Sequence, residues 1–137
     1  MLTGRGRYVD DLSMPETCHA FVVRSPYAHA RLLSINSVNA VNSPGVLLVL
    51  TGEDVINEQI GDLACLSFPK LSDNRSSFCP TQPILASKKV RFAGEGIALI
   101  VAETLAQAKD AGELLEVEYE PLPAVTLIDA HGFNAPK

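Results

Sequence analysis

The sequence has no tryptophan, few aromatic residues, and no apolar run long enough for a membrane helix. The apolar stretch at residues 97–102 is far shorter than the ~20 residues that a spanning helix needs. The first residues lack the apolar core of a signal peptide, so we expect no secretory signal. Three cysteines stand far apart at Cys18, Cys65 and Cys79. An odd number without a C-x-x-C pair favours a reduced, cytoplasmic protein over a disulfide scaffold.

Positive charge is also scarce, with 11 Lys and Arg against 16 Asp and Glu and a formal net charge of -5. A nucleic-acid or anionic-membrane binder needs clustered basic side chains. The basic residues that come close in sequence are Arg5 with Arg7, and Lys88 with Lys89 beside Arg91. We interpret both groups as solvated surface and therefore predict neither a nucleic-acid nor a membrane partner.

Length and composition fit one globular domain spanning residues 1–137, because 47% of the residues are hydrophobic and two cores would be hard to fill. Residues 1–17 read as an extended lead-in. Residues 57–83 form a long irregular segment with little periodicity and several prolines, either a loop or a set of short edge strands. Such insertions in compact domains are functional or disordered, and we favour a docking surface here.

Runs of β-branched and aromatic residues predict strands at 20–24, 31–36, 46–50, 89–92 and 97–102. The run at 46–50 is apolar throughout, so both its faces are expected to be covered. At 116–120 Val117 and Tyr119 alternate with glutamates, which is typical of a strand with one wet face. Prolines follow at 121 and 123.

Capping patterns mark the helix starts. Either Asn36 or Ser37 can cap a short helical turn near residues 38–41. Thr51 with Asp54, and Thr104 with Gln107, have the spacing of a capping box. The second box opens the main helix, about 104–115, whose apolar face carries Leu105, Ala108, Ala111 and Leu115.

The order of these elements predicts an α+β fold with a mixed β-sheet, one main helix and short helical turns. The strand at 116–120 is expected to return beside 97–102 and form a right-handed βαβ unit. Between the last two apolar strands, Gly94 and Gly96 permit the positive φ of a tight turn or bulge. Glu95 between them is expected to be an exposed turn acid, with contact to a ligand or another chain as the alternative.

Sequence motifs for chemistry are weak. Gly4 and Gly6 suggest a phosphate loop, but the third glycine is replaced by Val9 and no P-loop lysine follows. Asp10 and Asp11 favour a turn or cap over a cation site.

The histidines at 19, 29 and 131 lack zinc-ligand spacing, and Cys18 beside His19 would point to the opposite face of a strand. Ser25 precedes a proline and belongs to no G-x-S-x-G motif. No nucleophile, base and oxyanion donor come together in the sequence. We therefore assign no catalytic, cofactor-binding or metal-ligating residue.

Five blocks in order resemble the α/β-hammerhead domain that opens the molybdopterin-binding large subunit of the xanthine dehydrogenase, aldehyde oxidase and carbon monoxide dehydrogenase family. They are Gly4-Arg-Gly-Arg-Tyr-Val-Asp-Asp-Leu12; Val23-Arg-Ser-Pro-Tyr-Ala-His-Ala-Arg31; Pro44-Gly-Val46 with Thr51-Gly-Glu-Asp54; Val90-Arg-Phe-Ala-Gly-Glu-Gly-Ile-Ala98 leading into Val101-Ala-Glu-Thr104; and Val117-Glu-Tyr-Glu-Pro-Leu-Pro-Ala-Val125. The resemblance covers about residues 3–130. This chain differs at Gly96, where the family often has proline, and at Asn36, where it often has aspartate.

The resemblance implies a structural domain of a molybdenum hydroxylase that is inert alone. In the family the molybdopterin ligands and the catalytic base belong to later domains, so no functional residue carries over to this chain. Molybdopterin with molybdenum, iron–sulfur clusters and FAD are expected in the complete complex. The implied partners are the molybdopterin-binding remainder of the large subunit, an iron–sulfur subunit and a flavin subunit. The alternative is an independent protein-interaction module that has lost its catalytic context.

Overall fold

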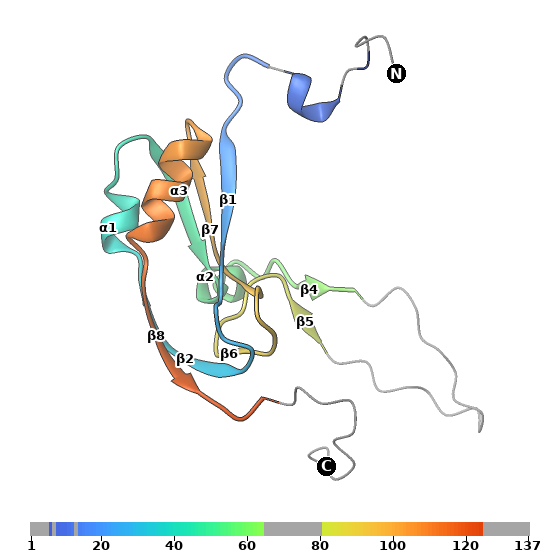
Figure 1. Ribbon diagram of the computed structural model, residues 1–137, viewed down its shortest axis with the longest axis vertical. Coiled ribbons are helices and arrows are strands. Elements are labelled where there is room, and N and C mark those ends of the chain that lie inside the picture. Colours follow the sequence, from blue (N-terminus) through green and yellow to red (C-terminus); the bar gives the residue numbers. More distant parts are fainter. Residues whose placement is uncertain (1–5, 7, 13, 65–80, 125–137) are drawn as a thin grey trace, which may run out of the picture.

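The computed structural model describes residues 6, 8–12, 14–64 and 81–124 (Figure 1). In chain order, a 3-10 turn at Val9–Asp11 is followed by β1 (His19–Arg24), β2 (Ala30–Asn36), α1 (Val38–Val41), β3 (Val46–Thr51), α2 (Gly52–Asn57), β4 (Asp62–Leu63), β5 (Gln82–Pro83), β6 (Lys89–Val90), β7 (Gly96–Ala102), α3 (Leu105–Glu113) and β8 (Glu116–Pro121). The α+β class is confirmed. The predicted strands agree with the observed ones to within a residue or two at most ends.

The described strands form two three-stranded sheets, ordered β1-β7-β3 and β6-β2-β8, and a two-stranded ribbon of β4 and β5. Every pair is antiparallel, so the expected mixed sheet is not found among the described strands. The predicted βαβ unit is wrong, because β8 pairs with β2 rather than returning beside β7. Cross-strand bonds stabilise this pairing, among them Asn36 Nδ2 to Glu116 Oε2 at 3.0 Å and Arg31 Nη1 to Glu120 Oε2 at 3.0 Å.

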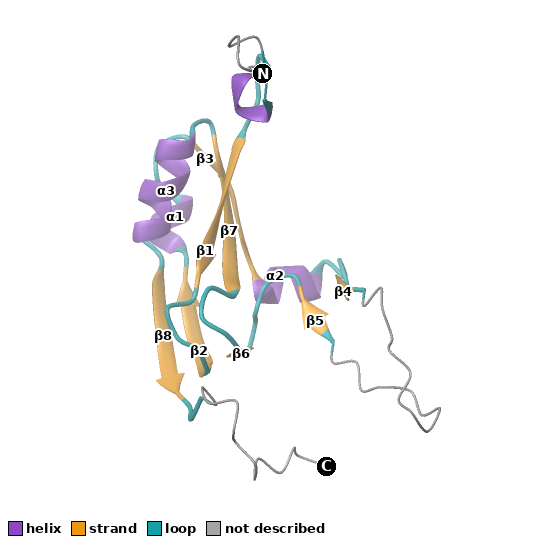
Figure 2. Ribbon diagram, turned by 45° about the vertical axis from the view of Figure 1, so that its right-hand side comes forward, coloured by secondary structure: helices purple, strands orange, loops and turns teal. Residues whose placement is uncertain are grey.

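Helices α1 and α3 cover one face of the β1-β7-β3 sheet (Figure 2). The buried residues there are alanines on both helices and on the strand, with Ile100 the one larger member, and comprise Ala40, Ile100, Ala102, Ala108 and Ala111. Phe21 packs its ring over α3 at Gly112, where any side chain would approach the ring within 3.1 Å. Small residues on α3 thus let the helix lie close to the strands.

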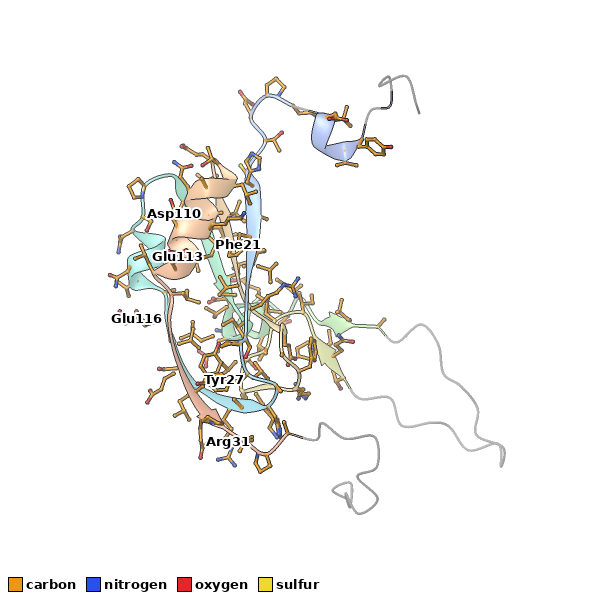
Figure 3. The ribbon with its side chains drawn as sticks, in the orientation of Figure 1. Phe21, Tyr27, Arg31, Asp110, Glu113 and Glu116 are labelled. Carbon is orange, nitrogen blue, oxygen red and sulfur yellow. The ribbon has the colours of Figure 1, made fainter. Side chains whose placement is uncertain are left out.

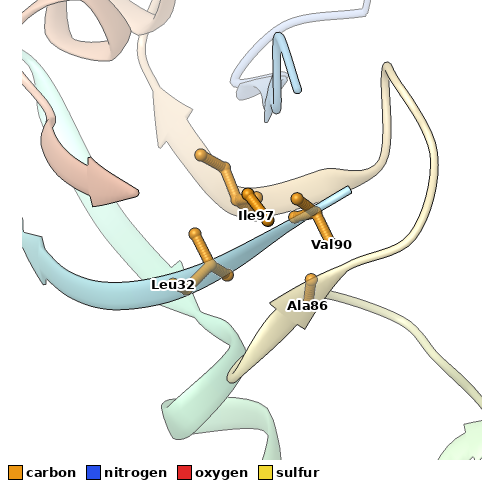
Figure 4. Packing of buried hydrophobic residues seen from close by; sticks show 5 residues of the cluster. Leu32, Ala86, Val90 and Ile97 are labelled. Carbon is orange, nitrogen blue, oxygen red and sulfur yellow. The ribbon is translucent and has the colours of Figure 1, made fainter. Parts of the chain in front are cut away.

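A second core joins the two sheets (Figure 4). Its buried members are Ala30, Leu32, Ala86, Val90 and Ile97. Ile97 comes from β7 in one sheet, whereas Leu32 and Val90 come from β2 and β6 in the other. This cluster packs the two sheets together beside the turn between β6 and β7, with Val90 before the turn and Ile97 after it.

Strand β3 differs from the expectation that both its faces are covered. It lies at the edge of its sheet, with a register irregularity between Val46 and Leu48. Leu47 and Leu48 are 55% and 45% exposed. The apolar run therefore does not report burial of both faces within the described residues.

Caps follow the sequence pattern closely but not fully. The Thr51–Asp54 capping box is present, with Asp54 N donating to Thr51 Oγ1 and Thr51 N donating to Asp54 Oδ2. At α3, Gln107 N donates to Thr104 Oγ1 at 3.2 Å, but Thr104 Oγ1 donates to Gln107 Oε1 in place of the reciprocal backbone bond. Ser37 is the N-cap of α1, while Asn36 Oδ1 accepts the bond from Val38 N.

The two irregular segments are partly described. In the lead-in, Tyr8 N donates to Asp11 Oδ2 at 2.9 Å, which confirms a turn for the aspartate pair. This turn projects away from the sheets (Figure 1). In the stretch 57–83, the short strands β4 and β5 pair with each other, as one of the two expectations had it. Residues 65–80 lie outside the described residues.

Candidate functional site

The face of the β1-β7-β3 sheet opposite α3 is the strongest candidate for a functional surface. Side chains alternate along a strand, so the neighbours of Phe21, Val49 and Ile100, which pack toward α3, point to the other side. The register places these neighbours in two cross-strand rows. We define them as the open face: Val22, Leu99 and Leu50 in one row, and Ala20, Val101 and Leu48 in the other.

A groove of about 320 Å³ lies where this face meets α2 and the residues around β5. It is lined by Val22, Arg24, Leu50, Val55, Ile60, Ile84, Leu85, Gly96 and Leu99. Eight of these nine residues have no polar side-chain atom. Ile60 and Ile84 on its border are 55% and 43% exposed. The groove is therefore an apolar recess that continues the open face rather than a polar pocket suited to catalysis.

Arg24 is the charged residue of this groove. Its Nη1 donates to the carbonyl oxygen of Gly94 at 2.8 Å, which holds the side chain against the β6–β7 turn. Within the described part of the chain no carboxylate pairs with Arg24. The guanidinium keeps further donors for an acceptor from outside, because it carries five N–H groups.

The β6–β7 turn holds Arg24 in place, and its structure corrects the expectation for Glu95. Glu95 is 6% exposed, not an exposed turn acid. Its Oε2 accepts a hydrogen bond from Arg91 N, and its Oε1 lies 3.9 Å from Arg91 Nη1. The buried Glu95 carboxylate therefore links the two ends of the turn by binding the backbone and side chain of Arg91.

The two glycines of the turn have different roles. Gly94 has φ +88°, which confirms the predicted positive φ at that position. Gly96 is part of β7 and has no positive φ, so the prediction is wrong there. A Cβ at Gly96 would lie 3.1 Å from Val22 Cγ1 and 3.3 Å from Leu85 Cδ2. Glycine at this position keeps the groove floor tightly packed.

The outer face of the β6-β2-β8 sheet contrasts with the open face. Glu116, Glu118 and Glu120 project from β8 and bond to Asn36, Ser34 and Arg31 on β2. Figure 3 labels Arg31 and Glu116 on this pair of strands. The alternation predicted at 116–120 is confirmed, and this sheet has the expected wet face.

Two groups have shifted pKa values. Hydrogen bonds from the Thr51 side chain and backbone lower the pKa of Asp54 at the start of α2. Burial raises the pKa of Tyr119, whose ring lies 4.8 Å from that of Tyr27. Both shifts follow from capping and core packing, and at neutral pH they keep the Asp54 carboxyl ionised and the Tyr119 hydroxyl protonated.

The residues considered for chemistry in the sequence do not come together. Cys18 is exposed at the foot of β1. His29 Nδ1 bonds to the carbonyl oxygen of Pro123 at 2.7 Å, which ties the chain after β8 to the loop before β2. Ser25 is buried, and its Oγ accepts from Tyr27 N at 3.1 Å in a local turn. Gly4, His131 and two of the cysteines, Cys65 and Cys79, lie outside the described residues.

The described residues also contain no cluster of potential metal ligands. No group of three or more His, Cys, Asp or Glu side chains gathers among residues 6, 8–12, 14–64 and 81–124. In the same ranges every buried side-chain nitrogen or oxygen has a hydrogen-bond partner. The described residues therefore bring together no set of side chains of the kind that holds a metal ion. None of the helices that the structure describes is long and apolar enough to cross a membrane.

Sequence reasoning missed the open face. Its strands β1, β3 and β7 are apolar on both sides, so alternation gives no signal that separates one face from the other. The available signal was the contrast between these apolar strands and residues 116–120, where glutamates at every other position mark the face that is exposed to solvent. An apolar second face indicates a surface meant for burial.

Comparison with known proteins bears out the resemblance. The family model for the "Aldehyde oxidase and xanthine dehydrogenase, a/b hammerhead domain" matches residues 3–123. The carbon monoxide dehydrogenase large chain of Afipia carboxidovorans is 39% identical over 122 residues, which cover 89% of this chain and 14% of that protein. The xanthine dehydrogenase molybdenum-binding subunit of Escherichia coli O157:H7 is 36% identical over 129 residues, covering 94% of this chain and 17% of the relative.

A solved structure supports the fold. Quinoline 2-oxidoreductase from Pseudomonas putida 86 superposes with a TM-score of 0.79 at 44% identity, covering 94% of this chain and 16% of that one. The chain thus spans about a sixth of the length of these relatives. It belongs to the aldehyde oxidase and xanthine dehydrogenase α/β-hammerhead domain family.

Proposed function

We propose that this chain is a structural domain of a molybdenum hydroxylase large subunit, within an oxidoreductase of the xanthine, aldehyde or carbon monoxide dehydrogenase type. One observation carries the proposal. The family match takes in residues 3–123, nearly the whole chain, whereas the relatives are about six times longer. In the relatives, most of the polypeptide therefore lies outside the matched domain, and we place the catalytic residues in that larger part.

In this proposal residues 1–137 form one domain that is inert alone. The complete complex would contain molybdopterin with molybdenum, iron–sulfur clusters and FAD. The partners would be the molybdopterin-binding remainder of the large subunit, an iron–sulfur subunit and a flavin subunit. The names of the relatives support the molybdenum part, since one is a molybdenum-binding subunit and another a Cu,Mo-containing carbon monoxide dehydrogenase.

The chain's own contribution is mechanical. Its described residues present no nucleophile, base and oxyanion donor in mutual reach, so they provide no transition-state stabilisation. What they provide is a pair of sheets that share a core, with one apolar face open. A domain of this kind positions neighbouring domains by burying its surface against them.

The test is elemental and catalytic analysis of the purified chain against the complete complex. The isolated chain is expected to fold, to contain no stoichiometric molybdenum, iron or flavin, and to oxidise no aldehyde, purine or carbon monoxide. The complex containing it is expected to carry all three. Stoichiometric metal in the isolated chain would contradict the structural role.

The alternative, an independent interaction module, rests on the same open apolar face. The neighbouring coding sequence separates the two proposals. A molybdopterin-binding reading frame, fused or directly downstream, favours the structural domain, whereas its absence favours the module.

A further inference from the structure

The outer faces of the two three-stranded sheets differ in the polarity of their side chains. On the outer face of the β6-β2-β8 sheet, charged and polar side chains of β2 and β8 bond across the strands, as at Arg31 with Glu120, although Leu33 on β2 is also 56% exposed. The open face of the other sheet carries none of these groups. An antiparallel sheet that faces water on one side alternates apolar and polar residues. The open face departs from that rule, which marks it as an interface rather than a solvated surface.

Exposed apolar residues lie on the open face and at the border of the groove, which share Val22, Leu50 and Leu99. Leu48 is 45% exposed on the open face, and Ile60 and Ile84 border the groove at its end. Adjacent apolar residues that stay wet together cost free energy that burial recovers, at about 25 cal/mol for each Å². A partner surface that fills the groove and lies across the sheet would recover most of it.

Two observations support the choice of partner. The relatives carry this domain in polypeptides about six times longer, so in them the remainder of the large subunit is tethered next to it. A segment of the same polypeptide meets the surface in an intramolecular step, which favours it over a second copy or a separate subunit of equal intrinsic affinity. The second observation is Arg24, a cation in the groove without a carboxylate partner among the described residues.

We propose that the open face and its groove bind an apolar segment from the remainder of the large subunit, and that a carboxylate flanking this segment meets Arg24. The inference rests on the proposed function and specifies which surface performs it. The apolar part fills the recess between the sheet and α2. The carboxylate accepts from the guanidinium donors that the Gly94 carbonyl leaves free.

Hydroxyl-radical footprinting tests the surface without any mutation, because it reads the solvent exposure of individual leucine and isoleucine side chains. The isolated chain and the assembled enzyme are compared. We expect at least fivefold slower oxidation of Leu48, Ile60 and Ile84 in the assembly. Leu33 on β2 is the matched control, since it is 56% exposed but lies on the other sheet, and it is expected to keep its rate.

Several results would overturn the proposal. Equal oxidation rates in the assembly and the isolated chain would show that the open face stays in solvent, while leaving the proposed function intact. Protection already present in the isolated chain would place the occupant within residues 1–137, and protection that grows with its concentration would indicate a second copy. Failure of the chain to enter any assembly would contradict the proposed function as well.

Photo-crosslinking identifies the partner directly. The assembled enzyme is prepared with p-benzoylphenylalanine in place of Ile84, and the captured peptide is sequenced by mass spectrometry. A large-subunit peptide that is apolar and contains Asp or Glu is the expected result. A peptide from the iron–sulfur or flavin subunit would overturn the choice of partner, and an apolar peptide without a carboxylate would overturn the role of Arg24.

Discussion

Replacement of Gly94 by valine isolates the cost of backbone strain in the β6–β7 turn. A Cβ at this position would meet no heavy atom within 4 Å, so the Cβ itself causes no steric collision. The backbone is at φ +88°, where an L-residue loses about 1–2 kcal/mol and a β-branched one up to about 3. Gly94 N donates to Ser25 O at 2.8 Å, and Arg24 Nη1 donates to Gly94 O at 2.8 Å. These two bonds prevent the turn from relaxing.

The expected net destabilisation by Gly94→Val is about 1–2 kcal/mol, because a smaller entropy of the unfolded chain offsets roughly 0.4–1 kcal/mol. Urea unfolding followed by circular dichroism measures it. With a slope of about 1.5 kcal/mol per M, the midpoint falls by roughly 1 M. Gly94→Asn should cost clearly less, since asparagine tolerates positive φ.

Gly61→Val is the matched control, because Gly61 also has positive φ, at +86°, and open space around its Cβ. Gly61 is exposed, and no bond such as those at Gly94 holds its turn, so relaxation is expected to reduce the loss. An unchanged midpoint for Gly94→Val would refute the strain argument. Equal losses at the two positions would show that the bonds to Ser25 and Arg24 do not hold the turn.

Three further predictions concern single side chains. Thr104→Ala should destabilise the chain by about 1 kcal/mol through loss of the α3 cap and Thr104→Ser much less, with equal losses in urea unfolding contradicting the cap. Glu95→Ala should cost about 1.5–3 kcal/mol by leaving Arg91 N without its charged acceptor, and Glu95→Gln less; equal midpoints for wild type and Glu95→Ala would exclude this role. Because the Asp54 pKa lies below its ordinary value of 3.8, its stabilisation is present above that pH and is lost as pH falls through the lowered pKa. Asp54→Asn should therefore be less stable than wild type near neutral pH, with the gap closing in acid; a gap independent of pH would contradict the ionised cap.

Local signals in the sequence were sufficient for most elements. The Thr51–Asp54 box and the alternation at Val117 and Tyr119 depend on residues a few positions apart, and both are confirmed. The positive φ at Gly94 is likewise a local requirement. Such local features could be predicted because they depend little on the tertiary arrangement around them.

Long-range pairing was beyond the reach of these signals. Strand β8 follows α3 directly, yet it joins the other sheet, because its glutamates bond to polar residues of β2 and its apolar side packs with Leu32. The sequence between β7 and β8 carries no mark of this choice. The burial of Glu95 likewise depends on Arg91 turning its backbone N–H inward, which only the folded turn specifies.

The candidate surface could be predicted only in outline. Residues 57–83 were chosen as the docking surface, and Ile60 does border the groove. Most of the groove comes from β1, β3, β7 and the residues near β5, which are distant in sequence. Periodicity cannot show which face of an apolar strand lacks a cover.

The most direct test of the central claim is complementation of a large subunit from which this domain has been removed. Adding the 137-residue chain should restore a 1:1 assembly and the oxidase or dehydrogenase activity, while the chain alone has none. Glutamate substitution at Leu48 should weaken the restored assembly at least tenfold, whereas Leu33→Glu should leave it unchanged. Full activity of the truncated subunit without the chain, or no assembly after its addition, would contradict the account.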